Sequence, residues 1–159
     1  MKGLIIYDSF FGNTEQVARE IGKVLGAEHD VEVLRAGEVK PERVKDNKLL
    51  IVGSPTRKFR PVPSVTGLLG KIPKNGLKGV KAAAFDTRIV LEDANPGFLR
   101  FLMKRFGWAA QPIADRLVKK GGEMIVPPEG FAVKDSEGPL KEGEAERAAD
   151  WAKRILAEI

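Results

Sequence analysis

Apolar runs of strand length alternate with amphipathic stretches of helical period along nearly the whole chain. Regular alternation of this kind favours an α/β fold, in which helices cover both faces of a parallel sheet. Pro127 and Pro128 lack N–H donors and should interrupt the last strand. We expect strands over residues 2–7, 31–34, 48–52, 80–85, 123–126 and 131–133, and helices over residues 14–25, 64–72, 98–106, 111–120 and 142–158. The pattern predicts a three-layer, doubly wound parallel sheet in which the two last segments form a single fifth strand.

The turn between the first strand and the first helix carries the strongest chemical signal, the run Ser9-Phe10-Phe11-Gly12-Asn13-Thr14. The first N–H groups of a helix have no partner within it, and the helix dipole adds positive charge there, so this turn suits a phosphate. Ser9, Asn13 and Thr14 can add side-chain donors, and Gly12 lets an anion approach the backbone. A helix start without any ligand is the alternative, because Asn and Thr begin many helices.

Two further loops are expected at the same edge of the sheet. In a doubly wound sheet, ligands bind outside the carboxyl ends of the strands, where the strand order reverses. The loop after the third strand contains Gly53-Ser54-Pro55-Thr56 and continues through Arg57-Lys58-Phe59-Arg60. The loop after the fourth strand contains Asp86-Thr87-Arg88. The three loops together predict one ligand site.

The residue types that the chain lacks limit the kinds of catalytic and metal site that it can form. The chain has no cysteine, which excludes disulfides, thiolate metal sites and cysteine catalysis, and its one histidine, His29, lies in a polar turn. We therefore expect no metal site and no catalytic side chain. The 159 residues suit a single domain over residues 1–159. No apolar run reaches the length of a membrane span or a signal sequence, so we expect a cytoplasmic protein.

The three loops resemble those of flavodoxins. Gly12-Asn13-Thr14 is similar to the end of the loop that holds the FMN phosphate in that family, and Gly53-Ser54-Pro55-Thr56 resembles its second flavin loop. Asp86-Thr87-Arg88 falls at the third loop. Flavodoxins usually have a hydroxyl residue where this chain has Phe11, and a tyrosine beside the third loop that is absent here. The resemblance extends over nearly the whole chain in the order of its elements.

The resemblance implies a flavodoxin-like sheet with strand order 2-1-3-4-5 and FMN as the cofactor. It assigns FMN contacts to Ser9, Phe10, Phe11, Gly12, Asn13, Thr14, Ser54, Pro55, Thr56, Arg57, Phe59, Asp86, Thr87 and Arg88. Phe59 would lie against the isoalloxazine ring, because offset stacking of aromatic planes is favourable. Packing of Phe59 on Pro61 or Pro63 within its own loop is the alternative.

The charge of the chain differs from that of electron-carrying flavodoxins, which are typically acidic. The formal net charge is +5, and Arg57, Lys58, Arg60 and Arg88 fall in the loops that would border the ring. Positive charge favours the reduced, anionic flavin. A surface charge pair is worth ~1 kcal/mol and ~1.4 kcal/mol equals about 59 mV for one electron, so each such residue should raise the potential by roughly tens of millivolts. The excess charge favours an acidic protein partner over nucleic acid, because it is spread along the chain.

The resemblance implies electron transfer, with a redox protein partner or a small acceptor. The sequence leaves open whether the protein is an electron carrier or a quinone-type reductase. If it is a reductase, it would be an FMN-dependent NAD(P)H oxidoreductase. The sequence also leaves the oligomeric state open. A flavodoxin-like scaffold without cofactor, acting as a protein-interaction module, is the alternative. A phosphoacceptor receiver domain shares this fold but needs a carboxylate after the third strand, where this chain has Gly53-Ser54.

Overall fold

The structure is a computed structural model, and it describes residues 1–89 and 107–159. The strands within these residues form one sheet: β1 (Lys2–Tyr7), β2 (Asp30–Arg35), β3 (Leu49–Pro55), β4 (Lys81–Ile89), β5 (Glu123–Met124) and β6 (Glu129–Val133). The sheet runs in the order β2-β1-β3-β4-β5, with β6 also paired to β4, and all these pairings are parallel. The predicted α/β class and the 2-1-3-4-5 strand order are confirmed.

β5 and β6 are two parts of the fifth strand. β5 pairs with the start of β4, where Glu123 lies opposite Lys81, and β6 pairs with its end, where Val133 lies opposite Ile89. Pro127 and Pro128 lie between the two parts and have no N–H to donate to the ladder. The predicted interruption of this strand is therefore confirmed.

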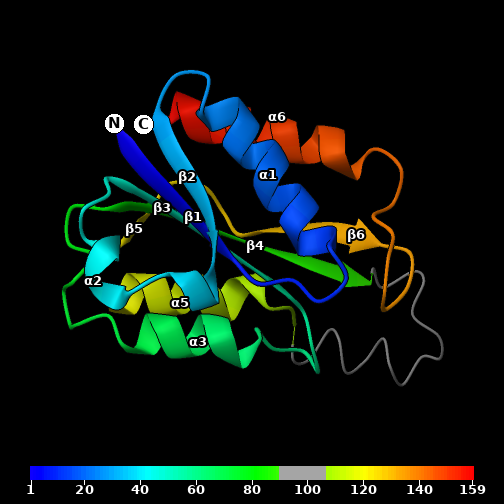
Figure 1. The fold of residues 1–159 in the computed structure, drawn as a ribbon, viewed down its shortest axis with the longest axis horizontal. Coiled ribbons are helices and arrows are strands. Elements are labelled where there is room, and N and C mark those ends of the chain that lie inside the picture. The colour runs from blue at the N-terminus through cyan, green and yellow to red at the C-terminus, as the bar shows by residue number, and fades with distance from the viewer. Residues whose placement is uncertain (90–106) are drawn as a thin grey trace.

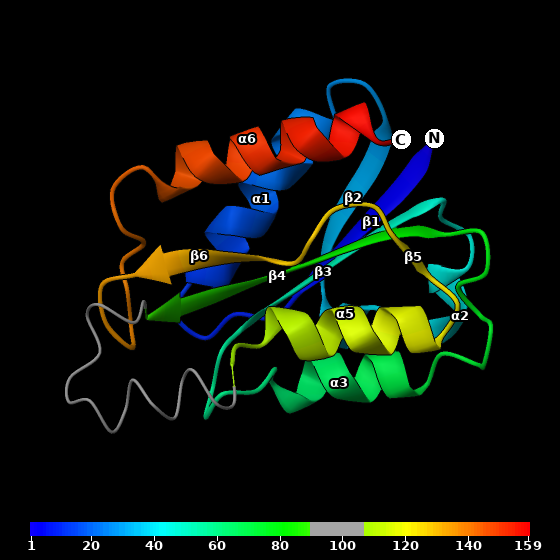
Figure 2. The same ribbon diagram turned by 180° about the vertical axis from the view of Figure 1, so that it is seen from behind.

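The helices form two layers, one on each face of the sheet (Figures 1 and 2). One layer consists of α1 (Asn13–Leu25) and α6 (Glu144–Ala157), and the other of α2 (Pro41–Val44), α3 (Pro63–Gly70) and α5 (Ala110–Lys119). The sequence did not predict the short helix α2 or the 3-10 turn Ala36–Glu38. The helix predicted over residues 98–106 lies outside the described residues. None of the described helices is long and apolar enough to cross a membrane.

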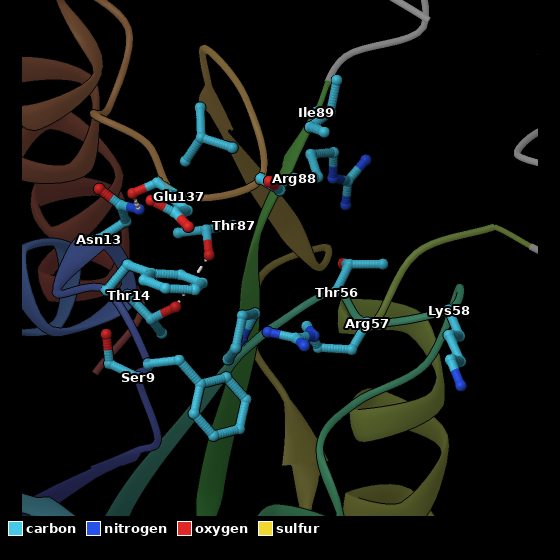
Figure 3. Close-up of a pocket in the computed structure, with 15 residues that line it drawn as sticks. Ser9, Asn13, Thr14, Thr56, Arg57, Lys58, Thr87, Arg88, Ile89 and Glu137 are labelled. Carbon is cyan, nitrogen blue, oxygen red and sulfur yellow. Dashed lines mark hydrogen bonds between the residues drawn. The ribbon is translucent and has the colours of Figure 1, made fainter.

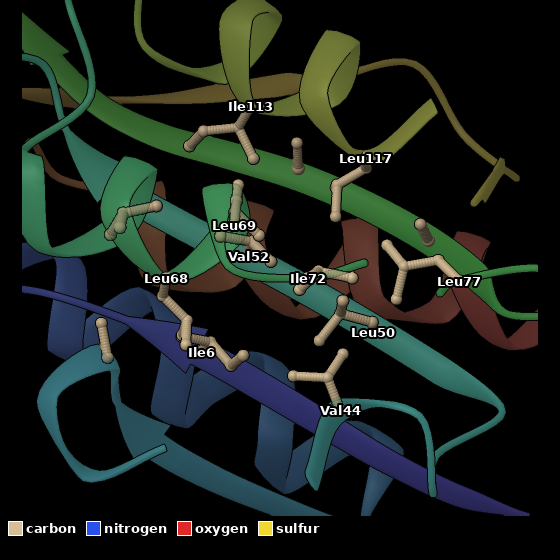
Figure 4. Close-up of a cluster of buried hydrophobic side chains, with 14 of the residues drawn as sticks. Ile6, Val44, Leu50, Val52, Leu68, Leu69, Ile72, Leu77, Ile113 and Leu117 are labelled. Carbon is tan, nitrogen blue, oxygen red and sulfur yellow. The ribbon is translucent and has the colours of Figure 1, made fainter. Parts of the chain in front are cut away.

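The central strands β1, β3 and β4 contribute alternating side chains to two separate hydrophobic cores, one on each face of the sheet. Ile6, Leu50 and Val52 point toward α3 and α5, where they pack with Leu69 and Ile113 (Figure 4). The next residues along the strands face the other way: Ile5, Tyr7, Ile51, Ala83 and Phe85 pack toward α1 and α6. Burial on both faces explains why these strands are continuously apolar, and each fully buried Leu, Ile or Val side chain contributes roughly 1.5–3 kcal/mol.

Trp151 of α6 closes the core between α6 and the sheet. Its ring lies edge-on to Phe85 and Phe131, with centroids 6.1 and 6.0 Å away, and 2% of the residue is exposed. Edge-to-face contacts of this kind are favourable between aromatic rings. Trp151 is therefore a packing residue of this core.

β3 and β4 extend further than predicted, and this corrects the assignment of two segments. Gly53 to Pro55 and Asp86 to Arg88 were expected in loops, but they belong to the strands. The ladder continues because β4 has partners on both sides, with Pro55 opposite Thr87 in β3 and Ala132 opposite Arg88 in β6. Strand alternation then directs Thr87 to the α1 side of the sheet and its two neighbours to the α5 side.

Candidate functional site

A cavity of about 340 Å³ lies at the carboxyl ends of β1, β3 and β4 (Figure 3). Ten of the residues predicted to contact FMN line it: Ser9, Phe10, Phe11, Asn13, Thr14, Pro55, Thr56, Arg57, Thr87 and Arg88. Four other predicted contact residues are not among the lining residues: Gly12, Ser54, Phe59 and Asp86. The volume falls in the range of small-molecule sites, about 300–1,000 Å³. The three predicted segments therefore meet around one cavity.

The wall of the cavity also contains residues that the sequence did not single out as ligand contacts. They are Lys58, Ile89, Val133, Ser136 and Glu137. Lys58 had been expected near the ring only for its charge. The last three come from the end of β6 and the loop after it, which reaches the cavity because β6 pairs with the end of β4. The signal available in the sequence was the position of this loop, since the carboxyl end of the fifth strand lies at the same edge of the sheet.

The N-terminal end of α1 faces the cavity, and its N-cap residue provides no side-chain cap. Gly12 is the N-cap residue with φ 89°, and no side-chain cap bonds this end of the helix among residues 1–89 and 107–159. The turn is closed from within, because the Ser9 hydroxyl accepts the Gly12 N–H at 3.0 Å. An ideal Cβ on Gly12 would meet nothing within 4 Å, so the space in front of this turn is open. Uncapped N–H groups and the positive end of the helix dipole together suit an anion.

A buried pair of hydroxyls ties α1 to β4 beneath the cavity. Thr14 Oγ1 and Thr87 Oγ1 lie 2.8 Å apart, within hydrogen-bond distance, and the two residues are 1% and 5% exposed (Figure 3). Thr87 reaches Thr14 because it points to the α1 side of β4, as Ala83 and Phe85 do. This contact fixes the start of α1 against the end of β4.

Asn13 connects the same turn to the loop after β6. Its side-chain amide donates to the Glu137 carbonyl at 3.0 Å. The next residue, Gly138, has φ 100°, and a Cβ there would lie 2.5 Å from the Asn13 amide. Glycine is therefore required at this position both by its backbone conformation and by the approach of Asn13.

Asp86 and Arg88 form an ion pair on the α5 side of β4. The Arg88 guanidinium donates to both Asp86 oxygens at 2.6 Å, and the Ala110 N–H at the start of α5 donates to the same carboxylate at 2.9 Å. Burial raises the pKa of the Asp86 carboxyl, while its bonds to Arg88 and to the Ala110 N–H act in the opposite direction. Arg88 also lies over the Trp108 ring, 4.6 Å from its centroid. The positive charge of Arg88 is thus compensated inside the protein.

Ser54 and Thr56 stabilise the segment after β3 from the inside. Ser54 is fully buried, accepts the Val62 N–H at 3.0 Å and donates to the Pro55 carbonyl at 2.8 Å. Thr56 lines the cavity, and its hydroxyl accepts the Ala109 N–H at 3.1 Å. The buried hydroxyl of Ser54 therefore shapes the loop, and that of Thr56 links the loop to the start of α5.

Residues 57–60 form a tight turn beside the cavity. Arg57 and Arg60 exchange both backbone hydrogen bonds at 2.9 Å, and the two central residues, Lys58 and Phe59, have φ 50° and 67°. Positive φ at both central positions is typical of a type I′ turn, which glycine or asparagine usually occupies. The Arg57 guanidinium lies over the Phe10 ring, 5.0 Å from its centroid. This turn places two cationic side chains, Arg57 and Lys58, on the cavity wall.

Arg35, at the end of β2, bonds to the turn between β1 and α1 and does not itself line the cavity. Its guanidinium donates to the Ser9 carbonyl at 2.9 Å and to carboxylate oxygens of Asp8 and Glu15, each at 3.2 Å. Asp8 in turn accepts the Ser9 N–H at 2.8 Å. These bonds hold both the N–H and the carbonyl of Ser9 in place. No sequence signal pointed to Arg35, because its partners lie at least 20 residues away along the chain.

Comparison with family models matches residues 5–151 to the model described as Flavodoxin. Among curated proteins, the chain is similar to NADPH-dependent diflavin oxidoreductase 1 of Emericella nidulans, with 27% identity over 131 residues. That match covers 78% of this chain but 18% of the relative. The chain thus spans less than a fifth of the length of this relative.

Solved structures of flavodoxins share the fold over the full chain. Oxidised flavodoxin 1 of Bacillus cereus superposes with a TM-score of 0.78 at 17% identity, covering 100% of this chain and 99% of its own. Oxidised flavodoxin 2 of the same species gives a TM-score of 0.78 at 22% identity, covering 100% of both chains. Identities at this level support the shared fold alone.

Proposed function

The chain belongs to the flavodoxin family, and from this premise we propose that it binds FMN in the cavity at the ends of β1, β3 and β4 and carries electrons. FMN, when bound, supplies one- and two-electron redox chemistry. The observation that carries the proposal is the uncapped start of α1, which faces a cavity of about 340 Å³. A buried Thr14–Thr87 contact and the Arg35 bonds hold that helix start in place.

The donors around Gly12 fit the phosphate end of FMN. We assign the phosphate to the N–H groups that begin α1, at Asn13 and Thr14, with the Ser9 hydroxyl and the Asn13 amide as further donors. Gly12 leaves open space in front of these groups. Phosphates commonly bind at such helix starts because the N–H groups and the helix dipole favour negative charge.

We assign the flavin ring to the opposite part of the cavity. We assign Ile89 and Val133 to apolar contact with the ring, and Thr56 and Arg57 to its polar edge, since all four line the cavity. Arg57 makes no ion pair with any described residue and would favour the reduced, anionic flavin. Arg88 is compensated by Asp86 at 2.6 Å, so we expect little effect of Arg88 on the potential.

We propose a redox protein partner or a small quinone-type acceptor as the destination of the electrons. The cations of the turn 57–60 pair with no carboxylate in the described part of the chain, and they favour an anionic partner. The similarity to the diflavin oxidoreductase covers 18% of that protein, so NAD(P)H oxidation by this chain is a separate activity to test.

The proposal is tested by reconstituting the purified chain with FMN and measuring retained absorbance and quenched flavin fluorescence. Asn13→Asp is the discriminating variant. It loses the exposed bond to the Glu137 carbonyl, but an acid at the first helical position suits the helix dipole and repels a phosphate, so folding should persist while FMN affinity falls at least about tenfold. Riboflavin, which lacks the phosphate, should be much less affected. Asn75→Asp makes the same change before β4, at the opposite edge of the sheet, and should leave FMN affinity unchanged. A chain that does not retain FMN would favour the cofactor-free scaffold.

A further inference from the structure

The mouth of the cavity exposes two neighbouring aromatic side chains. Phe10 and Phe11 are 54% and 50% exposed, and within residues 1–89 and 107–159 the other large exposed apolar side chains are Met1 and Val118. Both phenylalanines also line the cavity. We call this pair the aromatic rim. Exposed adjacent aromatic residues at the edge of a cavity are typical of an interaction surface, because they supply large contact area at low conformational cost.

The turn beside the aromatic rim carries three positive charges. Arg57, Lys58 and Arg60 are exposed, and none of them forms an ion pair with a described residue. We call residues 57–60 the cationic turn. The two backbone bonds of 2.9 Å between Arg57 and Arg60 hold its shape. This contrasts with Arg35, Arg88 and Arg147, whose charges are all paired with carboxylates.

The rim and the turn form one surface. The Arg57 guanidinium lies 5.0 Å from the centroid of the Phe10 ring, so the cation and the apolar face are in direct contact. Glu137, an acidic residue that lines the cavity, belongs to the loop after β6 and lies across the cavity from Arg57 and Lys58 (Figure 3). Among the described residues, the charge around the mouth is therefore asymmetric, with the positive side next to the exposed aromatics.

We propose that the aromatic rim and the cationic turn together form the docking surface for an acidic partner protein, with Phe10 and Phe11 in the contact and Arg57 and Lys58 facing its carboxylates. The proposal rests on the proposed function, because a partner docked there would lie against the exposed side of the cofactor cavity. Complementary charge steers encounter and fixes orientation, and a central apolar contact is excluded from water on docking. A net charge of +5 adds attraction over longer range.

The test begins with FMN-loaded, oxidised protein, whose flavin absorbance shows independently that FMN is bound. The inert trianion hexacyanochromate(III) is then added, and paramagnetic broadening of the backbone amide resonances maps where an anion gathers. We expect the strongest broadening at residues 10–11 and 57–58. Polyglutamate should displace the trianion from the same amides, since it carries the carboxylates of an acidic protein surface.

Two charge-matched double variants make the test specific. Arg57→Gln/Lys58→Gln should weaken polyglutamate binding about fivefold or more at low ionic strength, because two exposed charge pairs are lost. Lys23→Gln/Lys119→Gln removes the same charge in the last turns of α1 and α5, at the far edge of the sheet, and should change it by less than twofold. Equal weakening by both double variants, or broadening centred elsewhere, would overturn the proposal. Tighter binding of an oligothymidylate than of polyglutamate at the rim would also overturn it, in favour of nucleic acid.

Discussion

Arg35→Gln should weaken FMN binding by acting on the turn that receives the phosphate. In the folded chain, Arg35 bonds the Ser9 carbonyl at 2.9 Å and neutralises Asp8 and Glu15. Its removal frees the Ser9 carbonyl and leaves the Asp8 carboxylate without its ion pair near the site of a phosphate dianion, while Glu15 keeps its ion pair with Arg19 at 2.8 Å. Both effects act in the same direction, against binding of the phosphate.

The magnitude follows from these three contacts. The bond from a charged donor to the Ser9 carbonyl is worth about 1 kcal/mol after allowance for the exposure of Arg35, whose side chain is 39% exposed. The two ion pairs add about 0.5 kcal/mol each at this exposure. The sum, about 2 kcal/mol, corresponds to roughly thirtyfold in affinity if all of it orders the turn. We therefore expect the Kd for FMN to rise between roughly fivefold and thirtyfold.

The assay is fluorescence titration of the apoprotein with FMN and, in parallel, with riboflavin. Loss should be confined to FMN, and the riboflavin Kd should change less than threefold, because Arg35 lies behind the phosphate turn. Arg43→Gln is the matched control, since Arg43 pairs with Glu32 at the exposed surface and does not contact the turn. Equal losses for the two flavins, or an unchanged FMN Kd, would refute the reasoning.

Three further predictions concern stability, each measured by urea unfolding. Gly53→Ala should destabilise the fold by about 3 kcal/mol or slightly more, because the new Cβ would lie 2.0 Å from a ring carbon of the fully buried Phe85. Lys58→Gly should stabilise by about 1 kcal/mol, since it relieves φ 50° at a residue with a Cβ; a loss would show that the turn is unstrained. Partial burial of Glu144 is outweighed by its bonds to Arg147 and a backbone N–H, which hold its pKa below the usual 4.5. Its contribution is therefore present above pH 4.5 and lost as the pH falls below it, so Glu144→Gln should flatten the acid limb of the stability profile.

The fold was predictable because its elements repeat one local pattern. Strands such as β3, buried on both faces, produce continuous apolar runs, and helices such as α1 bury one face each, so both periods are visible in the sequence. The Pro127-Pro128 break was visible for a similar reason, since it follows from the chemistry of the residues themselves. The ends of the strands were not visible: β4 continues through Asp86 and Arg88 because neighbouring strands pair with it, and polar residues give no sign of that pairing.

One part of the candidate site could likewise be predicted from local residues, and another part could not. The turn at Gly12 could be predicted from local chemistry, because glycine, amide and hydroxyl residues are typical of a helix start. The contacts that fix it could not, since Asn13 donates to Glu137, 124 residues away, and Thr14 meets Thr87, 73 residues away. Their partners are determined by the order of the strands, which must be known before any such pair can be proposed.

Phe11 departs from the family pattern, and the structure changes how this departure is interpreted. In the sequence it is a missing hydroxyl donor, and it weakens the expectation of a phosphate site. In the structure the turn is closed by Ser9, whose hydroxyl accepts the Gly12 N–H at 3.0 Å, so the geometry of the turn does not depend on a hydroxyl at position 11. The Phe11 side chain is instead 50% exposed beside Phe10, which Arg57 covers. Phe11 therefore belongs to the aromatic rim, and Ser9 holds the shape of the turn.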